Sequence, residues 1–193
     1  MAEIVYGVAA SLDGFIGPPG GGPDWLAPFM RAGEDHGFAD FVDSVGALLM
    51  GSRTYEEALG RGPAASFGKP CYVFSSRPLP AGPDVIVTAS SPREVVSELE
   101  AKGITRAWLF GGARLFESFR SAGLVTGYWL GIVPGVLGGG LPLFASPGAP
   151  ARLRLTNSKV HPSGVVQLWY EVEPARSPRK PARKRPTARA GRR

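Results

Sequence analysis

The sequence predicts an α/β fold: a mixed central sheet with helices on both faces that ends in a C-terminal antiparallel hairpin. Apolar runs alternate with helical patterns as far as Gly123, and two longer strand patterns close the folded part after the helical patterns end. Helical crossovers connect parallel strands, whereas a short turn connects antiparallel ones. At 193 residues, of which 44% are hydrophobic, the chain is long enough for one sizeable core and too short for two full domains.

The individual elements follow from apolar periodicity and from capping residues. The expected strands are 3–10, 46–51, 69–76, 84–89, 106–112, 151–161 and 164–172. The expected helices are 38–45, 52–59, 91–103 and 113–123. Ser91 offers an N-cap for the third helix, Pro92 suits its first position and Gly103 provides a C-terminal stop. The last two strands face each other across the turn "PSG".

Charge separates the end of the chain from the rest. The net charge is +6, but residues 174–193 hold nine Lys or Arg and no acid, which leaves 13 basic against 16 acidic residues before them. This proline-rich tail has no apolar periodicity, so we expect it to be disordered. Its two interpretations are a weak, salt-sensitive contact with nucleic acid or another polyanion and a solubilising extension without a specific partner.

Composition also limits the cellular setting. Cys71 is the single cysteine, so no intramolecular disulfide and no cysteine-rich zinc site is expected. No apolar run approaches the roughly 18 residues of a membrane helix, and the N-terminus lacks the pattern of a secretory signal. We expect a soluble, cytoplasmic protein that has no contact with membranes.

Two glycines, Gly111 and Gly112, end one apolar run and open a helix in "LFGGARLFESF". Open α/β sheets bind ligands at the carboxyl ends of their strands, and free N–H groups at a helix start favour a phosphate. A tight turn that needs positive φ explains the same glycines without any ligand. The spacing is not G-x-G-x-x-G and falls late in the chain, which disfavours a standard dinucleotide fold.

Five motifs in register, "AASLDGFIG", "LLMGSRTYEEA", "VFSSRPLP", "LFGGARLFESF" and "LGGGLPLF", resemble the dihydrofolate reductase superfamily. The closer similarity is to the carboxy-terminal reductase domain of the bifunctional riboflavin-biosynthesis deaminase-reductase and to its stand-alone relatives. The resemblance covers residues 2–173 and implies a dihydrofolate reductase-like three-layer fold that binds NADPH. We therefore expect a reductase domain at 1–173 and the disordered tail at 174–193.

The resemblance also implies which residues bind the cofactor. In relatives the equivalents of Gly111 and Gly112 lie against it, joined by a cis peptide bond. The other implied cofactor-binding residues are Val8 and Ala9 near the nicotinamide, Gly51, the helix-opening Ala113, Arg114 and Leu115 at the pyrophosphate, and Arg53, Thr54, Ser75, Ser76 and Arg77 at the adenosine end. In many relatives an arginine directly follows the glycine of "MG", whereas Ser52 stands there in this chain. The shift turns Arg53 by about 100° on a helix, so a surface arginine is the alternative to a 2′-phosphate ligand.

The substrate side offers fewer matches. The resemblance points to an acid on the first helix, for which Asp35 is nearest and Asp24 competes, and Asp13 is a third candidate catalytic acid. An acid in a first helical turn also serves simply as a partner of the helix dipole. Trp25 and Phe38 are candidates to line a pocket for a flat heterocycle. The glycine- and proline-rich segment 17–24 is interpreted either as a lid or as a connecting loop.

His36 and His161 stand alone in the sequence, so we expect each to be a surface or hydrogen-bonded histidine, and no metal site is expected. Gly138 to Gly140, in "VPGVLGGGLPLF", allow a tight turn or a close approach and resemble a segment beside the substrate pocket of the riboflavin-type reductases.

Two functions remain open. One is an NADPH-dependent reductase of a small planar heterocycle such as an aminopyrimidine or a pterin; the other is a catalytically silent nucleotide-binding or regulatory relative whose tail recruits a partner. The apolar terminal hairpin and the riboflavin-type resemblance also lead us to expect a homodimer.

Overall fold

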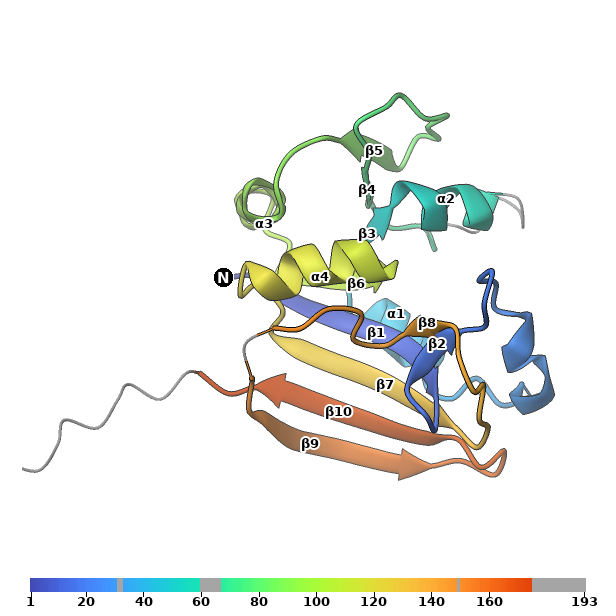
Figure 1. The fold of residues 1–193 in the computed structure, drawn as a ribbon. Coiled ribbons are helices and arrows are strands. Elements are labelled where there is room, and N and C mark those ends of the chain that lie inside the picture. Colours follow the sequence, from blue (N-terminus) through green and yellow to red (C-terminus); the bar gives the residue numbers. More distant parts are fainter. Residues whose placement is uncertain (31–32, 60–66, 149, 175–193) are drawn as a thin grey trace, which may run out of the picture.

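The computed structural model has the predicted α/β architecture and describes residues 1–30, 33–59, 67–148 and 150–174 (Figure 1). Its strands are β1 (Glu3–Ser11), β2 (Phe15–Gly17), β3 (Ala47–Gly51), β4 (Cys71–Phe74), β5 (Val85–Thr88), β6 (Arg106–Gly111), β7 (Gly127–Val133), β8 (Leu141–Pro142), β9 (Leu153–Val160) and β10 (Val166–Val172). Its helices are the 3₁₀ helix η1 (Asp24–Phe29), α1 (Phe38–Asp43), α2 (Ser52–Leu59), α3 (Pro92–Ala101) and α4 (Ala113–Ser121).

Eight of the strands form one mixed sheet in the order β5-β4-β3-β6-β1-β7-β10-β9. The neighbours from β5 to β7 run parallel, and β10 runs antiparallel to both β7 and β9. The N–H of His161 donates to the C=O of Val165 (2.9 Å) and closes the hairpin between β9 and β10. The prediction of a mixed sheet with a C-terminal antiparallel hairpin is therefore confirmed.

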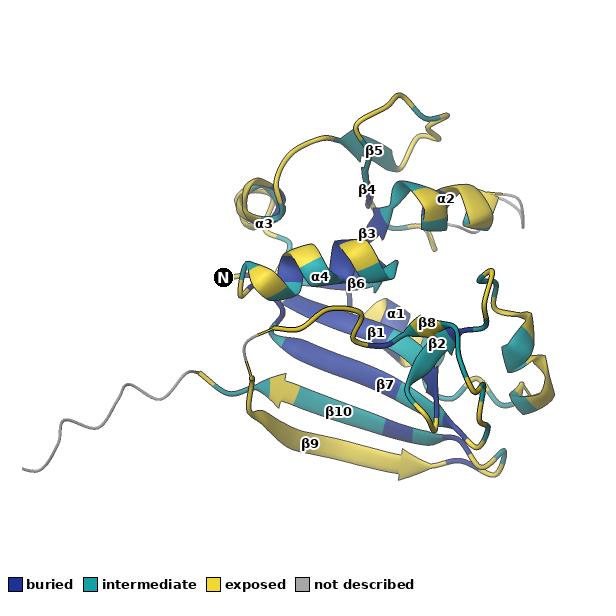
Figure 2. Cartoon of the chain, viewed as in Figure 1, coloured by how far each residue is buried: buried dark blue, intermediate teal, exposed yellow. Residues whose placement is uncertain are grey.

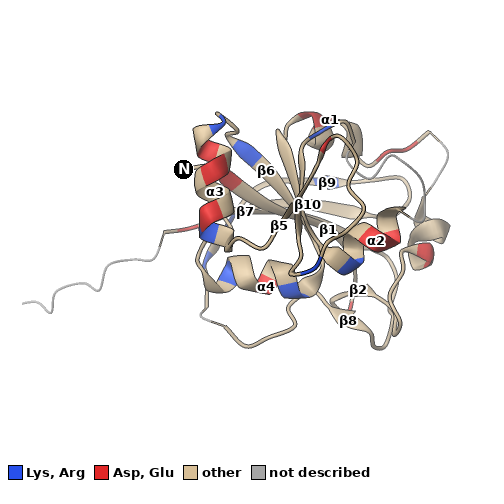
Figure 3. Cartoon of the chain, turned by 90° about the horizontal axis from the view of Figure 1, so that it is seen from above, with Lys and Arg blue, Asp and Glu red and all other residues tan. Residues whose placement is uncertain are grey.

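Apolar side chains on the two faces of the sheet form two separate clusters, so the fold has three layers. The first cluster packs Leu99 of α3 and Phe116 of α4 against Tyr6 of β1, whose ring stacks on that of Phe116 at 3.9 Å. The second packs Phe41 of α1 and Tyr55 of α2 against the opposite face. Figure 3 shows α1 and α4 on opposite sides of the strands. Each large apolar side chain that is fully buried contributes about 1.5–3 kcal/mol, so these two clusters hold the layers together.

The four predicted helices are present, and their capping explains where they begin and end. α2 spans the predicted residues 52–59, whereas α1, α3 and α4 each end slightly earlier than predicted. In α3 the Ser91 hydroxyl accepts from the N–H of Glu94, and the Glu94 carboxylate accepts from the N–H of Ser91. Gly103 follows with φ of +72°, the conformation that stops the helix.

The sequence patterns do not predict β2, η1, β7 or β8. β7 contains Gly127 and Gly131, which lower its strand propensity, yet it pairs along both edges with β1 and β10. β2 and β8 are too short for a periodic pattern and pair only with each other. Non-local pairing, which a single segment does not reveal, therefore forms these strands.

Every residue of β9, the edge strand at one end of the sheet, is exposed (Figure 2). Leu153, Leu155 and Val160 are 38%, 50% and 74% exposed, and all three lie on the face of the sheet shared with Tyr170 of β10. An edge strand also presents unpaired backbone N–H and C=O groups. β9 thus combines exposed apolar side chains with an open backbone edge.

The predicted disordered tail lies outside the described residues except for Pro174. In the described part of the chain, no helix has the length and apolar character needed to cross a membrane.

Candidate functional site

After β6 the chain continues on one face of the sheet, whereas after the neighbouring strands β1 and β3 it continues on the opposite face. α4, which follows β6, packs in the first apolar cluster, whereas α1 and α2, which follow β1 and β3, pack in the second. In open α/β sheets such divergence creates a crevice outside the carboxyl ends of the strands, where ligands bind. β6 ends at Gly111, so the predicted ligand-binding glycines lie at this crevice.

The three glycines predicted to bind the cofactor, Gly51, Gly111 and Gly112, lie together at the crevice. Met50 at the end of β3 pairs with Gly111, and a Cβ on Gly51 would lie 3.7 Å from the backbone nitrogen of Gly112. Gly111 has φ of +112°, which side chains rarely allow, and the peptide bond between Gly111 and Gly112 is cis, as the resemblance implied. The backbones at the ends of β3 and β6 therefore lie close together here, with no side chain of these glycines between them.

Gly112 also opens α4 without a side-chain cap. The N–H groups of Ala113, Arg114 and Leu115 have no acceptor within the helix, because donors in a first turn precede every i−4 carbonyl. The side chain of Leu115 is buried in the core, so this residue offers only its backbone. A Cβ on Gly112 would lie 3.2 Å from the hydroxyl oxygen of Thr54. Backbone donors and one hydroxyl thus surround the glycine at the positive end of the helix dipole, which favours an anion.

β1 separates from β6 beside these glycines. The ladder between the two strands ends at the pair of Tyr6 and Leu109, and β1 then continues to Ser11 paired with β7. Val8 and Ala9, the residues predicted to contact the nicotinamide, belong to this continuing segment. The indole N–H of Trp108 donates to the C=O of Gly7 (2.9 Å) and joins β6 to β1 where the ladder stops.

Ser75, Ser76 and Arg77, predicted for the adenosine end, follow β4, and the side chains of Ser75 and Arg77 already have partners. The guanidinium of Arg77 donates to both carboxylate oxygens of Glu56 on α2 (2.7 and 2.6 Å). The Ser75 hydroxyl donates to the C=O of Arg77 and accepts from its N–H, which shapes the turn that contains Ser76. Arg53 is exposed on α2, one turn before Glu56. An incoming phosphate would compete with Glu56 for Arg77, and an exposed ion pair of this kind is weak.

Asp13 ties the loop after β1 to the glycine-rich segment. Its carboxylate accepts from the Ser11 hydroxyl (2.6 Å) and from the N–H groups of Leu137 (3.1 Å) and Gly138 (2.7 Å). The bond from Ser11 makes the largest contribution to lowering the pKa of Asp13. Asp13 is therefore ionised at neutral pH, and its carboxylate is already hydrogen-bonded within the loop. These bonds support a structural role in place of the predicted catalytic one.

The close approach predicted for the glycine-rich turn takes place between backbone segments. A Cβ on Gly140 would lie 2.1 Å from the carbonyl oxygen of Gly17, and Gly140 has φ of +131°. The pairing of β2 with β8 brings the two segments together. These glycines therefore close the loop that covers the carboxyl end of β1.

The other two candidate acids lie in different surroundings. The carboxylate of Asp35 accepts from the N–H groups of Gly37 (2.9 Å) and Ala39 (3.1 Å), and these bonds lower its pKa. Asp35 thus binds N–H groups at the start of α1, a structural role that matches the helix-dipole alternative. Asp24 is exposed at the start of η1, next to a half-buried Trp25.

Phe38, the first residue of α1, lies in an aromatic group. Its ring lies 5.7 Å from that of Trp108 and 5.4 Å from that of Phe67 in edge-to-face contacts. Trp108 in turn contacts Phe110, which precedes Gly111 on β6. The structure therefore places Phe38 in a group of rings that reaches the glycines, whereas Trp25 takes part in none of the described ring contacts of this group.

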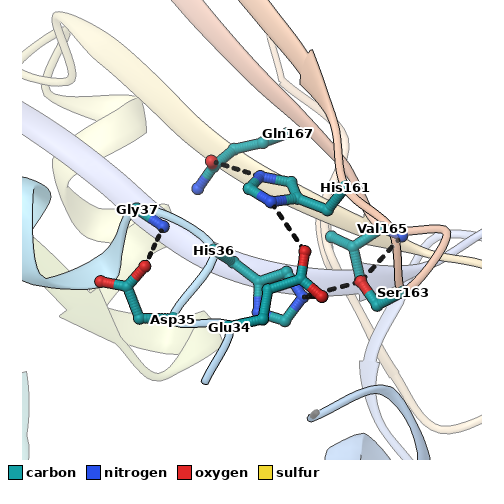
Figure 4. A network of polar contacts seen from close by, with 8 residues as sticks. All are labelled: Glu34, Asp35, His36, Gly37, His161, Ser163, Val165 and Gln167. Atoms are coloured by element: carbon teal, nitrogen blue, oxygen red, sulfur yellow. Dashed lines mark hydrogen bonds and ion pairs between the residues drawn. The ribbon is translucent and has the colours of Figure 1, made fainter. Parts of the chain in front are cut away.

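Sequence reasoning missed the association of Glu34, His36 and His161, named here the histidine cluster. The two imidazole rings lie 4.9 Å apart and Glu34 lies within 4 Å of each (Figure 4). The expectation that each histidine is hydrogen-bonded is confirmed, but the expectation that each stands alone is wrong. No local pattern would have revealed the cluster, because its members come from opposite ends of the sequence.

A family model decides where this chain belongs. The model of the RibD C-terminal domain matches residues 2–167. The chain belongs to the RibD C-terminal domain family. Two relatives from Bacillus subtilis (strain 168) are similar over nearly their whole length. The uncharacterized protein YwjB is 33% identical over 171 residues, a match that covers 87% of this chain and 97% of YwjB. The uncharacterized protein YyaP is 31% identical over 183 residues and is covered to 94%.

Solved structures agree with this RibD-type fold. A putative riboflavin biosynthesis protein from Shewanella sp. PV-4 superposes with a TM-score of 0.81 at 26% identity, covering 90% of this chain and 100% of that one. A deaminase/5-amino-6-(5-phosphoribosylamino)uracil reductase from Thermotoga maritima gives 0.68 at 15% identity, with 89% of this chain and 56% of that one covered. At that identity the likeness concerns the fold alone. The predicted dihydrofolate reductase-like three-layer fold is confirmed.

The bonds of Asp13 generate the first testable prediction. We expect its carboxyl group to titrate below the usual value of about 3.9, and Ser11→Ala to raise this pKa because it removes the strongest bond. Since the pKa is lower in the folded state than in the unfolded state, Asp13 stabilises the fold above the ordinary carboxyl pKa. That contribution disappears as the pH falls through the lowered value. NMR titration of the side-chain carboxyl measures the pKa, with Ser75→Ala as the control; an ordinary pKa in the unmodified protein would refute the prediction.

Proposed function

We propose that this RibD C-terminal domain protein is an NADPH-dependent reductase that transfers a hydride to a small planar heterocycle of the pyrimidine or pterin type. The crevice at the carboxyl end of β6, where three glycines expose backbone beside the first turn of α4, carries this proposal. The Thermotoga maritima protein is described as a 5-amino-6-(5-phosphoribosylamino)uracil reductase, and a similar structure from Corynebacterium diphtheriae as pyrimidine reductase-like. These descriptions favour a pyrimidine among the two heterocycle types.

The residues at the crevice fit a dinucleotide. The backbone of Gly111 and Gly112 leaves room for a close approach, and the free N–H groups at the start of α4 suit a pyrophosphate. The segment with Val8 and Ala9 lies where β1 leaves β6 and would orient a carboxamide. NADPH would supply the hydride, and the chain would supply binding, orientation and electrostatics.

The aromatic group beside the glycines suits a flat substrate. Phe38 and Phe110, both half-buried, offer ring faces and edges on which a heterocycle would stack, and the buried Trp108 packs against both of them. Asp13 and Asp35 hold backbone N–H groups. A proton-transfer role for Asp24, Asp13 or Asp35 stays a prediction.

The assignment of NADPH as the cofactor predicts how tightly the protein binds NADPH relative to NADH. The protein should bind NADPH at least about tenfold more tightly than NADH, equivalent to about 1.4 kcal/mol, because Arg77 is paired with Glu56 on α2, one turn after the exposed Arg53. Arg77→Gln should reduce this ratio and leave NADH affinity unchanged. Titration of reduced-nicotinamide fluorescence measures both affinities.

The matched control is Arg93→Gln, since Arg93 is also an exposed arginine whose guanidinium has a partner, the C=O of Ala122, but lies on α3. Equal affinity for the two nicotinamides would overturn the arginine assignment. Absence of binding to either would overturn the proposed function and favour a relative without reductase activity. Binding without oxidation of NADPH in the presence of pyrimidine and pterin substrates would also contradict a reductase that acts on them.

The glycine assignment predicts the effect of a side chain at Gly112. Gly112→Val should abolish NADPH binding and leave a folded protein, because its side chain would stand beside Thr54 at the start of α4. Gly82→Val is the control, since a Cβ there meets no atom within 4 Å. Fluorescence titration and circular dichroism report binding and folding. Near-normal NADPH affinity in the folded Gly112 variant would exclude close approach at this position.

We also propose that the protein is a homodimer, in which β9 is covered by a second chain. The strand presents Leu153, Leu155 and Val160 to solvent and has an open edge, and both features favour association. Light scattering should show a dimer at micromolar concentration, and Leu155→Lys should shift it toward the monomer. A monomer in the unmodified protein would contradict the proposal.

A further inference from the structure

The histidine cluster joins two parts of the fold that are far apart in the sequence. Glu34 and His36 lie in the loop before α1, and His161 lies in the turn between β9 and β10 (Figure 4). One potential ligand atom from each residue lies within 4.8 Å of the other two. The side chains of Glu34, His36 and His161 are only 16%, 11% and 3% exposed. Two imidazoles and a carboxylate are therefore gathered in a place largely withdrawn from water.

The carboxylate of Glu34 has a polar atom without a hydrogen bond. Its Oε1 is buried and accepts none, although Nδ1 of His161 lies 3.2 Å away. Its Oε2 lies 3.9 Å from Nε2 of His36. A buried carboxylate oxygen without a donor is costly, because nothing replaces the hydrogen bonds that it would make to water. Both oxygens instead face ring nitrogens that are potential metal ligands.

The partner of His161 on its far side determines which nitrogen is available. Nε2 of His161 lies 3.2 Å from Oε1 of Gln167, a side chain that is 2% exposed. With that oxygen as acceptor, Nε2 carries the hydrogen and Nδ1 presents a lone pair toward Glu34. The Glu34 carboxylate and the lone pair on Nδ1 of His161, both acceptors, then face each other in a buried site. A cation between them would remove their electrostatic repulsion. A metal-bound histidine commonly donates its second N–H in this way, which fixes the ring.

We propose that the histidine cluster binds a divalent transition-metal ion, with Zn²⁺ as the ion that fits it best. Two imidazoles and one carboxylate form a ligand set that zinc accepts, with a fourth position left for water or a substrate. Ligands at about 2.0–2.2 Å around a tetrahedral zinc lie about 3.3–3.6 Å from one another. The contact between Glu34 and His161, at 3.2 Å, is slightly shorter than that range. Nε2 of His36, now against the Ser163 hydroxyl, lies 3.9 Å from Glu34 and would have to move a few tenths of an ångström closer.

Neither a thiol nor a further histidine of the sequence competes with this site. Cys71 is the single cysteine, and burial raises the pKa of its thiol to about 12, so it stays protonated. His36 and His161 are the two histidines of the sequence. The bound ion would fasten the turn of the terminal hairpin to the loop that leads into α1, and would thereby fix Phe38 at the aromatic group.

Zinc binding to the full chain, prepared without an affinity tag and stripped with EDTA, tests this proposal. Competition with a chromogenic chelator should show one Zn²⁺ bound per chain. Glu34→Gln, His36→Gln and His161→Gln should each weaken binding by at least the roughly 10–100-fold that loss of a supporting residue costs. Glu57→Gln, on the exposed side of α2, is the matched control and should bind as tightly as the unmodified chain.

Two further measurements keep the result independent of folding defects in the variants. Zn²⁺ should raise the melting temperature of the unmodified chain, since an ion that binds the folded state stabilises it. Co²⁺ in place of Zn²⁺ should give the visible absorption of a tetrahedral site, and Glu34→Gln, which preserves size, should remove it. Absence of Zn²⁺ binding to the unmodified chain would overturn the proposal in favour of an imidazolium–carboxylate ion pair. Binding that survives all three substitutions would also overturn it.

Discussion

Close approach of bare backbone at the end of β6 is the constraint on which the candidate site depends. The chain turns there from the sheet into α4 on one face, while the helices after β1 and β3 cover the other face. Gly111 accepts a positive φ, and neither it nor Gly112 places a side chain in the space between β3 and α4. The free N–H groups of the first helical turn, the edge of β1 and the aromatic group all meet where these glycines lie.

Local sequence signals predict the parts of the fold that local interactions form. The capping box of Ser91 and Glu94 and the left-handed Gly103 mark α3 in the sequence as clearly as in the structure. β7 escapes such analysis, because its two glycines weaken a local strand signal and its pairing with β1 and β10 forms only in three dimensions. The same applies to β2 and β8, which stabilise each other across a long separation in sequence.

The candidate site also contains features that the local sequence reveals and features that only the three-dimensional structure reveals. The paired glycines are visible in the sequence because their role is local, between a strand and the helix after it. The roles of the acids are not visible in the sequence, because an aspartate that binds N–H groups at the start of a helix and one that transfers a proton are the same residue type. Asp35 binds two N–H groups of its own loop and helix, whereas Asp13 reaches across to Leu137 and Gly138. Only the partners in space distinguish these uses, and the histidine cluster is the extreme case, with ligands from both ends of the domain.

The bond from Trp108 to Gly7 has a consequence for how this family can diverge. A Cβ on Gly7 would lie 2.7 Å from the indole nitrogen of Trp108 and 3.0 Å from the ring of Phe41. Any side chain at position 7 therefore displaces the indole, and a smaller residue at position 108 leaves the carbonyl of Gly7 without its donor and opens a void beside Phe41. Each change alone leaves either a clash or an unpaired carbonyl, whereas the two together let a side chain at position 7 fill the space that the indole leaves. Among relatives, positions 7 and 108 should consequently vary as a pair, and the opening between β1 and β6 should change its width with them.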